Sequence, residues 1–479
     1  MTAVQWRLPL LPVFSWSAIP LILALTIVST GGARAATLAG GTQLWVSRYN
    51  GPANGDDEAA AMGVSPAGAR VFVTGTVHWG SSSGNDYGTV ALSASTGKQL
   101  WGVRYNGPDS LDDSPVAMEV SPDGSAIFVT GVSYGLTTDA DFATVAYTAS
   151  TGARRWVSRY NNSPQGYDRV TAMAVSPDGS EVFVAGYASR PGYYTDYLTV
   201  AYSASTGTQM WVERFSGLGG LDDAPSAVTV SRDGSDVYVT GGSVGLAGDS
   251  DYTTVAYSTS TGSQLWVSRY NGPGRGNDDA HALGTSPDGT KVFVTGSSLG
   301  STGSVDMATV SCDPHSGAQL SAARYEGPSH LPDVASALAV SPDGSRIFVT
   351  GYSTGGSTSA DYATVSYDPF LSQDWVRLYN GTANLTDVAT AVGVNPGSSE
   401  VFVTGRTSVS GVPNDDYGTV AYDIVTGAIV WGATYDGPGN DTNEPTALAV
   451  SPDGAKVFVT GKSTGSTTGL DWATVAYST

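Results

Sequence analysis

The chain has 479 residues, of which 61 are glycine and only 14% are charged. That composition is typical of many short strands joined by tight turns and argues against long, solvated helices. The formal net charge of -21 repels phosphate backbones, so we expect no nucleic-acid partner. The chain contains one cysteine, Cys312, which excludes an internal disulfide.

The first 35 residues predict a signal peptide. Arg7 supplies positive charge, residues 8–28 are largely apolar, and residues 33–35 (Ala-Arg-Ala) form a cleavage site. We expect cleavage between Ala35 and Ala36, a secreted extracellular protein, and one folded domain over residues 36–479. An uncleaved membrane anchor is the alternative, because the stretch between the flanking arginines carries no charge. No later stretch is apolar enough to span a bilayer, so we expect no membrane span after signal removal.

The rest of the chain repeats every 55 residues. The clearest marker is an Asp-aromatic-x-Thr-Val stretch, with Met307 replacing the aromatic residue in one copy. A fixed period of this size indicates a stacked or circular repeat architecture, which counts as one domain. The eight copies begin at Asp86, Asp141, Asp196, Asp251, Asp306, Asp361, Asp416 and Asp471.

Each repeat contains four strand patterns in a constant order. An Ala-rich strand such as Thr171–Val175 ends in a Ser-Pro-Asp-Gly turn, in which Pro and Gly favour tight reversal. Val-Phe-Val-Thr-Gly follows, as at Val71–Gly75, and then the Asp-aromatic stretch. A Ser-Thr-Gly turn leads to Leu-Trp-Val-x-Arg-Tyr, as at Leu265–Tyr270. The second and third strands are apolar at consecutive positions, which predicts that both of their faces are covered.

These patterns predict an all-β fold, an eight-bladed β-propeller of four-stranded antiparallel blades. The last repeat stops after its third strand, at Thr479. The missing fourth strand occurs at the other end of the chain, at Leu44–Tyr49. We therefore expect the N-terminal strand to close the last blade.

The stretches Ala201–Trp211 and Ala421–Trp431 resemble the tryptophan-docking repeat of PQQ-type (quinoprotein) propellers. The Val-Ser-Pro-Asp-Gly and Val-Phe-Val-Thr-Gly segments are also similar to the YVTN-type propeller repeat. The resemblance implies eight blades in which each tryptophan stacks against the next blade. Two copies depart from it, because Ser321 replaces the tryptophan and the turn before Trp375 lacks glycine.

The quinoprotein resemblance also implies a PQQ cofactor, a calcium-bound carboxylate base and a pair of adjacent cysteines against the cofactor. The single Cys312 cannot supply that pair, and it stands where other repeats have an aromatic residue. We therefore expect no PQQ, and expect Cys312 to be a small buried residue.

Two sets of aspartates are the main candidates for chemistry, and we expect both on the rim that carries the longer loops. The third-strand ring consists of the eight Asp-aromatic residues given above. The first-strand ring lies eight residues before each Ser-Pro turn: Asp57, Asp113, Asp168, Asp223, Asp278, Asp333 and Asp387, with Asn443 in the eighth copy. Because every repeat has one, a scaffold role that caps backbone N–H groups is the simpler interpretation. The functional alternative is calcium, for which the richest clusters contain Asp57, Asp112, Asp113, Asp278 and Asp279.

Other polar residues are candidates for more limited roles. His281 and Glu119 replace small residues on innermost strands, so we expect them to face the central channel. A recurring arginine of the fourth strand is expected to pair with rim aspartates and to set register: Arg48, Arg104, Arg159, Arg214, Arg269, Arg324 and Arg377.

The sequence therefore favours a secreted, monomeric propeller that acts as a binding scaffold without catalysis. Its partner would be an unidentified protein or carbohydrate at the loop-rich acidic face. One alternative is a quinoprotein-like dehydrogenase, or another enzyme with a site at the channel mouth. A second alternative is a structural component of the cell surface.

Overall fold

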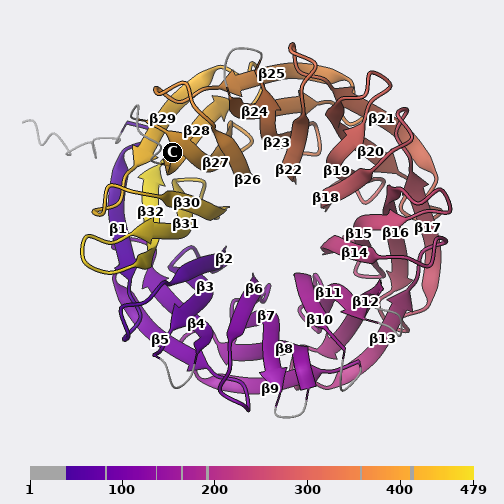
Figure 1. The fold of residues 1–479 in the computed structure, drawn as a ribbon. Helices are drawn as coiled ribbons and strands as arrows, with labels where there is room; N and C mark the ends of the chain where they lie inside the picture. The colour runs from indigo at the N-terminus through magenta and orange to yellow at the C-terminus, as the bar shows by residue number, and fades with distance from the viewer. Residues whose placement is uncertain are drawn as a thin grey trace, which may run out of the picture. The chain divides into compact units, whose positions relative to one another are not determined.

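The computed structural model describes residues 39–80, 84–135, 138–162, 166–189, 194–355, 359–409 and 415–479. In these ranges the chain forms strands and turns without helices, arranged as eight four-stranded antiparallel sheets around one axis (Figure 1). Over the same ranges there is no helix of the length and apolarity needed to cross a membrane. The predicted signal peptide and its cleavage site lie outside the described residues.

The eight blades follow one another along the chain. Blades 1 to 4 consist of β2 (Glu58–Val64), β3 (Arg70–His78), β4 (Asn85–Ser93) and β5 (Gln99–Tyr105); β6 (Asp113–Val120), β7 (Ala126–Gly135), β8 (Thr138–Thr148) and β9 (Arg154–Tyr160); β10 (Asp168–Val175), β11 (Glu181–Ser189), β12 (Thr195–Ser203) and β13 (Gln209–Phe215); and β14 (Asp223–Val230), β15 (Asp236–Val244), β16 (Ser250–Ser258) and β17 (Gln264–Tyr270). Blades 5 to 7 consist of β18 (Asp278–Thr285), β19 (Val292–Leu299), β20 (Val305–Cys312) and β21 (Gln319–Tyr325); β22 (Asp333–Val340), β23 (Ile347–Thr354), β24 (Ala360–Tyr367) and β25 (Gln373–Tyr379); and β26 (Val388–Val394), β27 (Glu400–Ser408), β28 (Asp415–Asp423) and β29 (Ile429–Tyr435). Blade 8 consists of β30 (Asn443–Val450), β31 (Lys456–Thr464), β32 (Leu470–Ser478) and β1 (Gln43–Tyr49).

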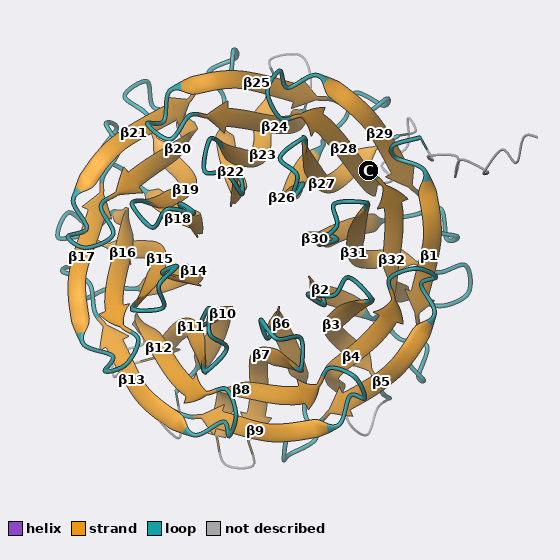
Figure 2. Cartoon of the chain, turned by 180° about the vertical axis from the view of Figure 1, so that it is seen from behind, coloured by secondary structure: helices purple, strands orange, loops and turns teal. Residues whose placement is uncertain are grey.

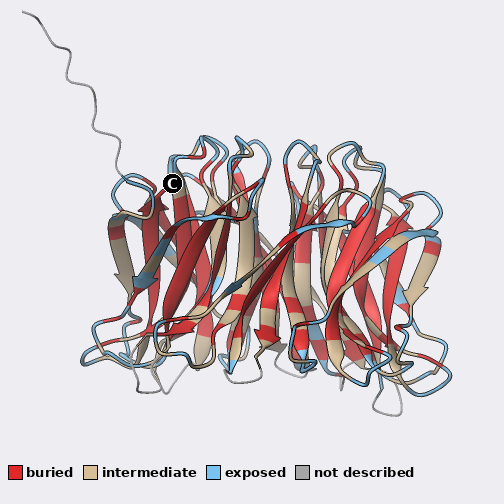
Figure 3. Ribbon diagram, turned by 90° about the horizontal axis from the view of Figure 1, so that it is seen from above, coloured by how far each residue is buried: buried red, intermediate tan, exposed pale blue. Residues whose placement is uncertain are grey.

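The order of strands within a blade follows the distance from the axis. First strands such as β6 lie innermost, and fourth strands such as β9 form the circumference (Figure 2). The two middle strands of each blade are almost wholly buried, as Figure 3 shows in red. Their consecutive apolar residues pack against both neighbouring blades, which confirms the interpretation of the Val-Phe-Val and Thr-Val-Ala patterns.

The ring closes where its two ends meet in blade 8. β1 pairs antiparallel with β32, with Trp45 opposite Ala476 and Tyr49 opposite Trp472. The backbone N–H of Gly41 donates to the carbonyl of Ser478 at 2.9 Å, just beyond the ladder. The predicted closure of the last blade by the N-terminal strand is therefore confirmed, and so is the blade count.

Each outer tryptophan docks on the turn of the next blade. The Nε1–H of Trp101 donates to the carbonyl of Ala149 at 3.1 Å. A Cβ built on Gly152 would approach the Trp101 ring to 2.8 Å, so the ring lies against glycine that adopts φ +73°. The same donation to the next blade is made by Trp45, Trp156, Trp211, Trp266 and Trp375. This contact confirms the stacking that the PQQ-type resemblance implies.

Blade 8 has no such turn, because its third and fourth strands come from opposite ends of the chain. Gly40 and Gly41, just before β1, take its place against Trp431: a Cβ on Gly41 would lie 2.8 Å from that ring. Gly41 has φ +75°, the same left-handed conformation as the turn glycines. The N-terminal segment therefore supplies both a strand and a docking surface to the closed ring.

The two departures from the tryptophan repeat compensate each other across the boundary between blades 5 and 6. Ser321 of blade 5 stands where the tryptophan would be, and Leu371 of blade 6 occupies the turn position that is glycine elsewhere. Leu371 keeps the left-handed backbone, with φ +65°, and its side chain is buried. It belongs to the same apolar cluster as Phe293, whose counterparts in other blades contact the tryptophan of their own blade. Leu371 thus fills from the opposite side the space that an outer tryptophan fills elsewhere.

The ends of the strands define two different faces. The Ser-Pro-Asp-Gly and Ser-Thr-Gly hairpins make a tight-turn face, at the top of Figure 3, where Ser121 Oγ donates to Asp123 at 2.5 Å. The connections between second and third strands, and between blades, make the opposite, loop-rich face. Both aspartate rings lie on this loop-rich side, as the up-and-down topology predicted.

Candidate functional site

The first-strand ring of aspartates caps the loops that connect one blade to the next. Each of its seven carboxyl side chains is fully buried. Asp113 accepts a hydrogen bond from the Gly107 N–H at 2.5 Å, and Asp278 accepts from the N–H groups of Gly272 and Leu299 at 2.6 and 2.9 Å. The bond from the backbone six residues earlier recurs at Asp57, Asp168, Asp223, Asp333 and Asp387. These contacts support the scaffold interpretation, because each carboxylate satisfies buried backbone donors.

The third-strand ring is tied to the outermost strands by arginines of the same blade. Arg324 contacts Asp306 at 2.8 Å and also donates to the Tyr270 hydroxyl of the preceding blade at 3.1 Å. Ion pairs of the same kind join Arg48 to Asp471, Arg104 to Asp86, Arg159 to Asp141 and Arg214 to Asp196. At these five positions the arginine pairs with the rim aspartate of its own blade, as the register-setting hypothesis expected. Arg269 instead donates to Ser243 Oγ at 3.2 Å, and it forms no ion pair with Asp251 among the described residues.

Arg377 does not belong to this set, and the sequence prediction for it was wrong. Residue Leu378, not Arg377, stands opposite Ala363 in the register that the other arginines occupy. In the other copies the arginine is the third residue after the tryptophan position, whereas Arg377 is the second residue after Trp375 and so belongs to the opposite face of the strand. Arg377 instead donates to the carbonyls of Gly427 and Thr426 at 2.8 and 2.7 Å, on the next blade.

The two rings meet across each blade boundary. Asp86 of blade 1 lies near Asp113 and Asp112 of blade 2, and Arg104 opposes their combined charge. Burial raises the pKa of Asp86 to about 6, although the guanidinium lowers it. The rim is thus a repeated network of buried carboxylates and arginines.

The boundary between blades 7 and 8 breaks this network. Asp416 has Thr434 at the arginine position, opposite Gly418 in the ladder. The first-strand ring has an amide here, and the Asn443 Nδ2 group lies 3.4 Å from both Asp416 and Asp436. Burial, followed by the charge of Asp436, raises the pKa of Asp416 to about 6. Loss of one cation is therefore accompanied by loss of one carboxylate at the same boundary.

We expect Asp416 to make the ring less stable as pH rises from about 4 to 6. The folded state binds a proton more tightly than the unfolded chain, whose pKa is near 3.8, so its stabilising effect is present below that value and is lost above about 6. Thr434→Arg should raise the free energy of unfolding at pH 7.5 by about 1–2 kcal/mol and have little effect near pH 4.5. Chemical denaturation at pH 4.5, 5.5 and 7.5 measures this.

Asp416→Asn removes the titrating group and should flatten the same pH profile. Asp441→Asn, an exposed change on the neighbouring loop, is the matched control and should leave the wild-type slope. An unchanged slope in Asp416→Asn would show that other groups produce it.

The five carboxylates proposed as calcium ligands all accept hydrogen bonds from the protein. Asp57, Asp113 and Asp278 cap backbone as described above. Asp112 accepts from the Asn85 N–H of the previous blade at 2.8 Å, and Asp279 accepts from Ser250 Oγ at 2.9 Å. Over the described ranges, no three His, Cys, Asp or Glu side chains gather closely enough to hold a metal ion. Calcium binding in these loops stays a prediction.

His281 and Glu119 lie on innermost strands, β18 and β6, but behave differently. His281 occupies a bulge, and its Nδ1 contacts the Ala335 carbonyl of the next blade at 2.6 Å. Ser226 makes the equivalent contact from blade 4, to Ala280 at 2.6 Å, so the imidazole serves as a structural link. Glu119 is exposed, but protein surrounds it at longer range, and this poor hydration raises its pKa to about 7.

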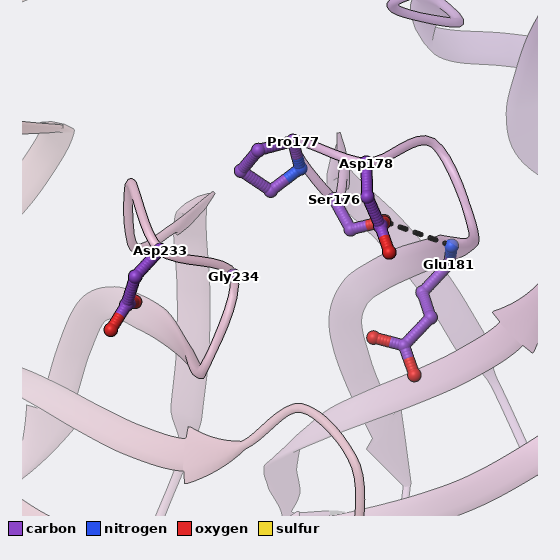
Figure 4. Close-up of a pocket in the computed structure, with 6 residues that line it drawn as sticks. All are labelled: Ser176, Pro177, Asp178, Glu181, Asp233 and Gly234. Atoms are coloured by element: carbon purple, nitrogen blue, oxygen red, sulfur yellow. Dashed lines mark hydrogen bonds between the residues drawn. The ribbon is translucent and has the colours of Figure 1, made fainter.

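Hollows between neighbouring blades open on the tight-turn face, where the sequence analysis placed no candidate residue. One, of about 340 Å³, lies between the turns of blades 3 and 4, where Asp178 and Glu181 stand across from Asp233 (Figure 4). In Figure 4 the Ser176 hydroxyl accepts from the Glu181 N–H, at 2.9 Å. The turn at Ser231 matches the other Ser-Pro-Asp-Gly turns except at its second residue, where Arg232 replaces proline.

Comparison with known proteins identifies the family to which this architecture belongs. The ring of eight four-stranded blades with docked tryptophans defines a PQQ-type β-propeller. The chain belongs to the family described as outer membrane protein assembly factor BamB, whose model matches residues 3–225 and 140–390. A search of curated proteins finds no match.

Solved structures share the fold at low sequence identity. Sqt1 from Chaetomium thermophilum, bound to the N-terminus of ribosomal protein L10, aligns with a TM-score of 0.58 at 12% identity, over 91% of this chain and 100% of Sqt1. The quinohemoprotein alcohol dehydrogenase of Comamonas testosteroni aligns with a TM-score of 0.55 at 11% identity, over 92% and 77%. Quinohemoprotein alcohol dehydrogenase ADHIIG of Pseudomonas putida HK5 gives 0.52 at 14%, over 91% and 76%. Both binding proteins and dehydrogenases therefore use this fold, so the fold alone does not choose between them.

The residues of this chain do not match the cofactor contacts that the quinoprotein resemblance implies. Cys312 is buried at the outer end of β20, where its Sγ lies 3.6 Å from Ser268 Oγ of blade 4. Burial raises the pKa of its thiol. The chain's one cysteine thus packs between blades, as expected, and cannot form a vicinal pair against a cofactor.

Proposed function

We propose that the protein is an exported β-propeller that binds a partner and does not catalyse a reaction. One observation carries this proposal: the rim residues best suited to chemistry are engaged in the same structural contacts in blade after blade. All seven first-strand aspartates cap backbone N–H groups, and at least five of the eight third-strand aspartates pair with an arginine of their own blade. A catalytic centre needs one set of unlike groups with free functional atoms, whereas a repeated frame leaves loop tips to vary.

The loop-rich face is the proposed partner surface. Carboxylates there that reach solvent include the exposed Asp222 and Asp441 and the half-buried Asp109 and Asp249, which are not part of the two buried rings. Such a face attracts a basic protein surface, or a carbohydrate that donates hydroxyl groups, and its attraction for a basic partner weakens as salt screens the charge. The signal-peptide pattern of residues 1–35 supports export to a compartment where such partners are met.

Capture from the secreted fraction of the source organism tests this proposal. The mature chain, immobilised, should retain a saturable partner that is released as ionic strength rises. Asp109→Asn combined with Asp441→Asn should weaken retention several-fold. Glu181→Gln combined with Glu400→Gln, which removes the same charge from the tight-turn face, should not.

The dehydrogenase alternative is tested in parallel. Saturating PQQ with calcium should give no rise in melting temperature and no dye-linked alcohol oxidation. A clear thermal shift together with turnover would overturn the non-catalytic proposal, and so would the absence of any saturable partner.

A further inference from the structure

A hollow between blades 4 and 5 is lined in part by residues that differ from those at the same positions in the other repeats. It lies on the tight-turn face and has a volume of about 420 Å³. That volume is within the range of small-molecule sites. The walls come from the turn after β14, the start of β15, the turn after β18 and the turn before β21.

Three of its lining residues break the pattern of their positions. Arg232 replaces a proline that is present in the other seven turns: Pro66, Pro122, Pro177, Pro287, Pro342, Pro396 and Pro452. Tyr238 replaces a phenylalanine that is present in the other seven blades: Phe72, Phe128, Phe183, Phe293, Phe348, Phe402 and Phe458. His315 replaces the serine found in four of the other turns. The convergence of three such departures from two neighbouring blades distinguishes this blade boundary from the other seven.

The carboxylates of Asp233 and Asp288 in the hollow have hydrogen-bond partners, whereas the guanidinium of Arg232 has none among the described residues. Asp233 and Asp288 are occupied by their own turns, where each accepts from a serine hydroxyl, Ser231 at 2.6 Å and Ser286 at 2.5 Å. By contrast, the exposed guanidinium of Arg232 has no ion-pair or hydrogen-bond partner among the residues that the structure describes. Arg232 also lines the wider hollow beside it, toward Pro287 and Pro342, so it stands where the two spaces join.

The remaining polar groups supply acceptors and donors at short range. Tyr238 is fully buried, and its hydroxyl lies 3.4 Å from the Pro314 carbonyl and 3.5 Å from Asp236. His315 is exposed and near Asp236: its charge opposes the rise in the pKa of that carboxyl, which burial and then the charge of Asp233 produce. The hollow thus offers one free cation beside a half-buried carboxylate, a phenol and an imidazole.

We infer that this hollow binds an acidic saccharide, with a sugar carboxylate on Arg232 and ring hydroxyls on Asp236 and His315. A uronic acid presents one carboxylate among several hydroxyl donors, which is the combination that these groups satisfy together. The guanidinium pairs with a carboxylate through two parallel hydrogen bonds. An acidic peptide fits less well, because its repeated charges would meet Asp233, Asp236 and Asp288.

The experiment compares binding by the mature wild-type chain and by three variants that restore the residue of other blades. Oligosaccharides of two to four sugars that carry a single uronic acid are titrated calorimetrically, alongside the same oligomers with that carboxylate methyl-esterified. Arg232→Pro should weaken binding about tenfold or more, and Tyr238→Phe or His315→Ser about threefold. The esterified oligomers should bind as weakly as Arg232→Pro does.

The three variants are expected to fold, because each one introduces the residue that other blades have at the same position. Their melting temperatures should match or exceed that of the wild type, since proline suits this turn position. Arg154→Ala, which removes an exposed arginine from the same face in blade 2, should bind like the wild type. No wild-type binding at millimolar oligomer, equal binding by Arg232→Pro, or tighter binding of oligo-glutamate than of the saccharide would each overturn the assignment. These outcomes are independent of whether a partner binds the loop-rich face.

Discussion

Deleting residues 37–50 should lower the melting temperature by roughly 10 °C or more and make the protein aggregate. The deletion removes β1, and with it the buried Trp45 and the bond from Arg48 to Asp471 at 2.8 Å. Loss of one buried tryptophan costs about 3–5 kcal/mol by itself, and each kcal/mol lowers the melting temperature of a large domain by about 2–4 °C. β32 would also become an open edge strand, a template for pairing between molecules.

Moving β1 to the other end of the chain tests whether the deletion acts by opening the ring or by removing the residues from that position in the sequence. Residues 39–50 can be moved to follow Thr479 through a short glycine-serine linker, because Gly41 and Ser478 already lie within hydrogen-bond distance. This rearranged chain should recover most of the stability and remain monodisperse. Calorimetry and light scattering give both readouts, and a deletion variant that melts like the full mature chain would refute the closure mechanism.

The second large effect is expected at Ser321 and Leu371. Leu371→Gly should destabilise the ring by about 3–4 kcal/mol, because it empties the space beside Phe293 that Leu371 fills. Ser321→Trp should also destabilise it, by about 1–3 kcal/mol, because the indole and the leucine compete for one volume.

The double variant Ser321→Trp with Leu371→Gly should recover most of the loss, since it recreates the tryptophan-on-glycine contact of the other blades. The coupling free energy from a double-mutant cycle, measured by denaturant unfolding, should therefore be large and favourable. Gly317→Leu at the equivalent turn of blade 5 is the matched control: Trp266 remains beneath it, so that change should only destabilise. Additive effects in the cycle would mean that the two departures are unrelated.

The architecture was predictable from sequence because the same strand and turn patterns recur in eight copies. The consecutive apolar residues at Val71–Gly75 indicate a strand that is buried on both faces. The fourth-strand pattern at Leu44–Tyr49 precedes the first repeat, and blade 8 was the one blade without a fourth strand. The error at Arg377 came from accepting an arginine one residue too early. It is the second residue after Trp375, whereas the paired arginines are the third, and a shift of one residue moves a side chain to the opposite face of the strand.

The candidate sites were less predictable because they depend on contacts between repeats. Sequence spacing identified the aspartate rings but could not show that Asp113 is buried beneath Gly107, or that Arg324 bridges to Tyr270. The hollow containing Arg232 could not be predicted for a different reason. Its walls come from turns of two blades, and the turn at Ser231 differs from the other copies only at its second residue.

The way in which blade 8 is assembled also sets the order of events during biosynthesis. The segment that leaves the ribosome first must wait for the last one, since Thr42 and Ser478 bond to each other across 436 positions of the chain. Until then the nascent polypeptide can stack blades side by side but cannot close the ring. Ring closure is thus deferred until the whole polypeptide has been synthesised.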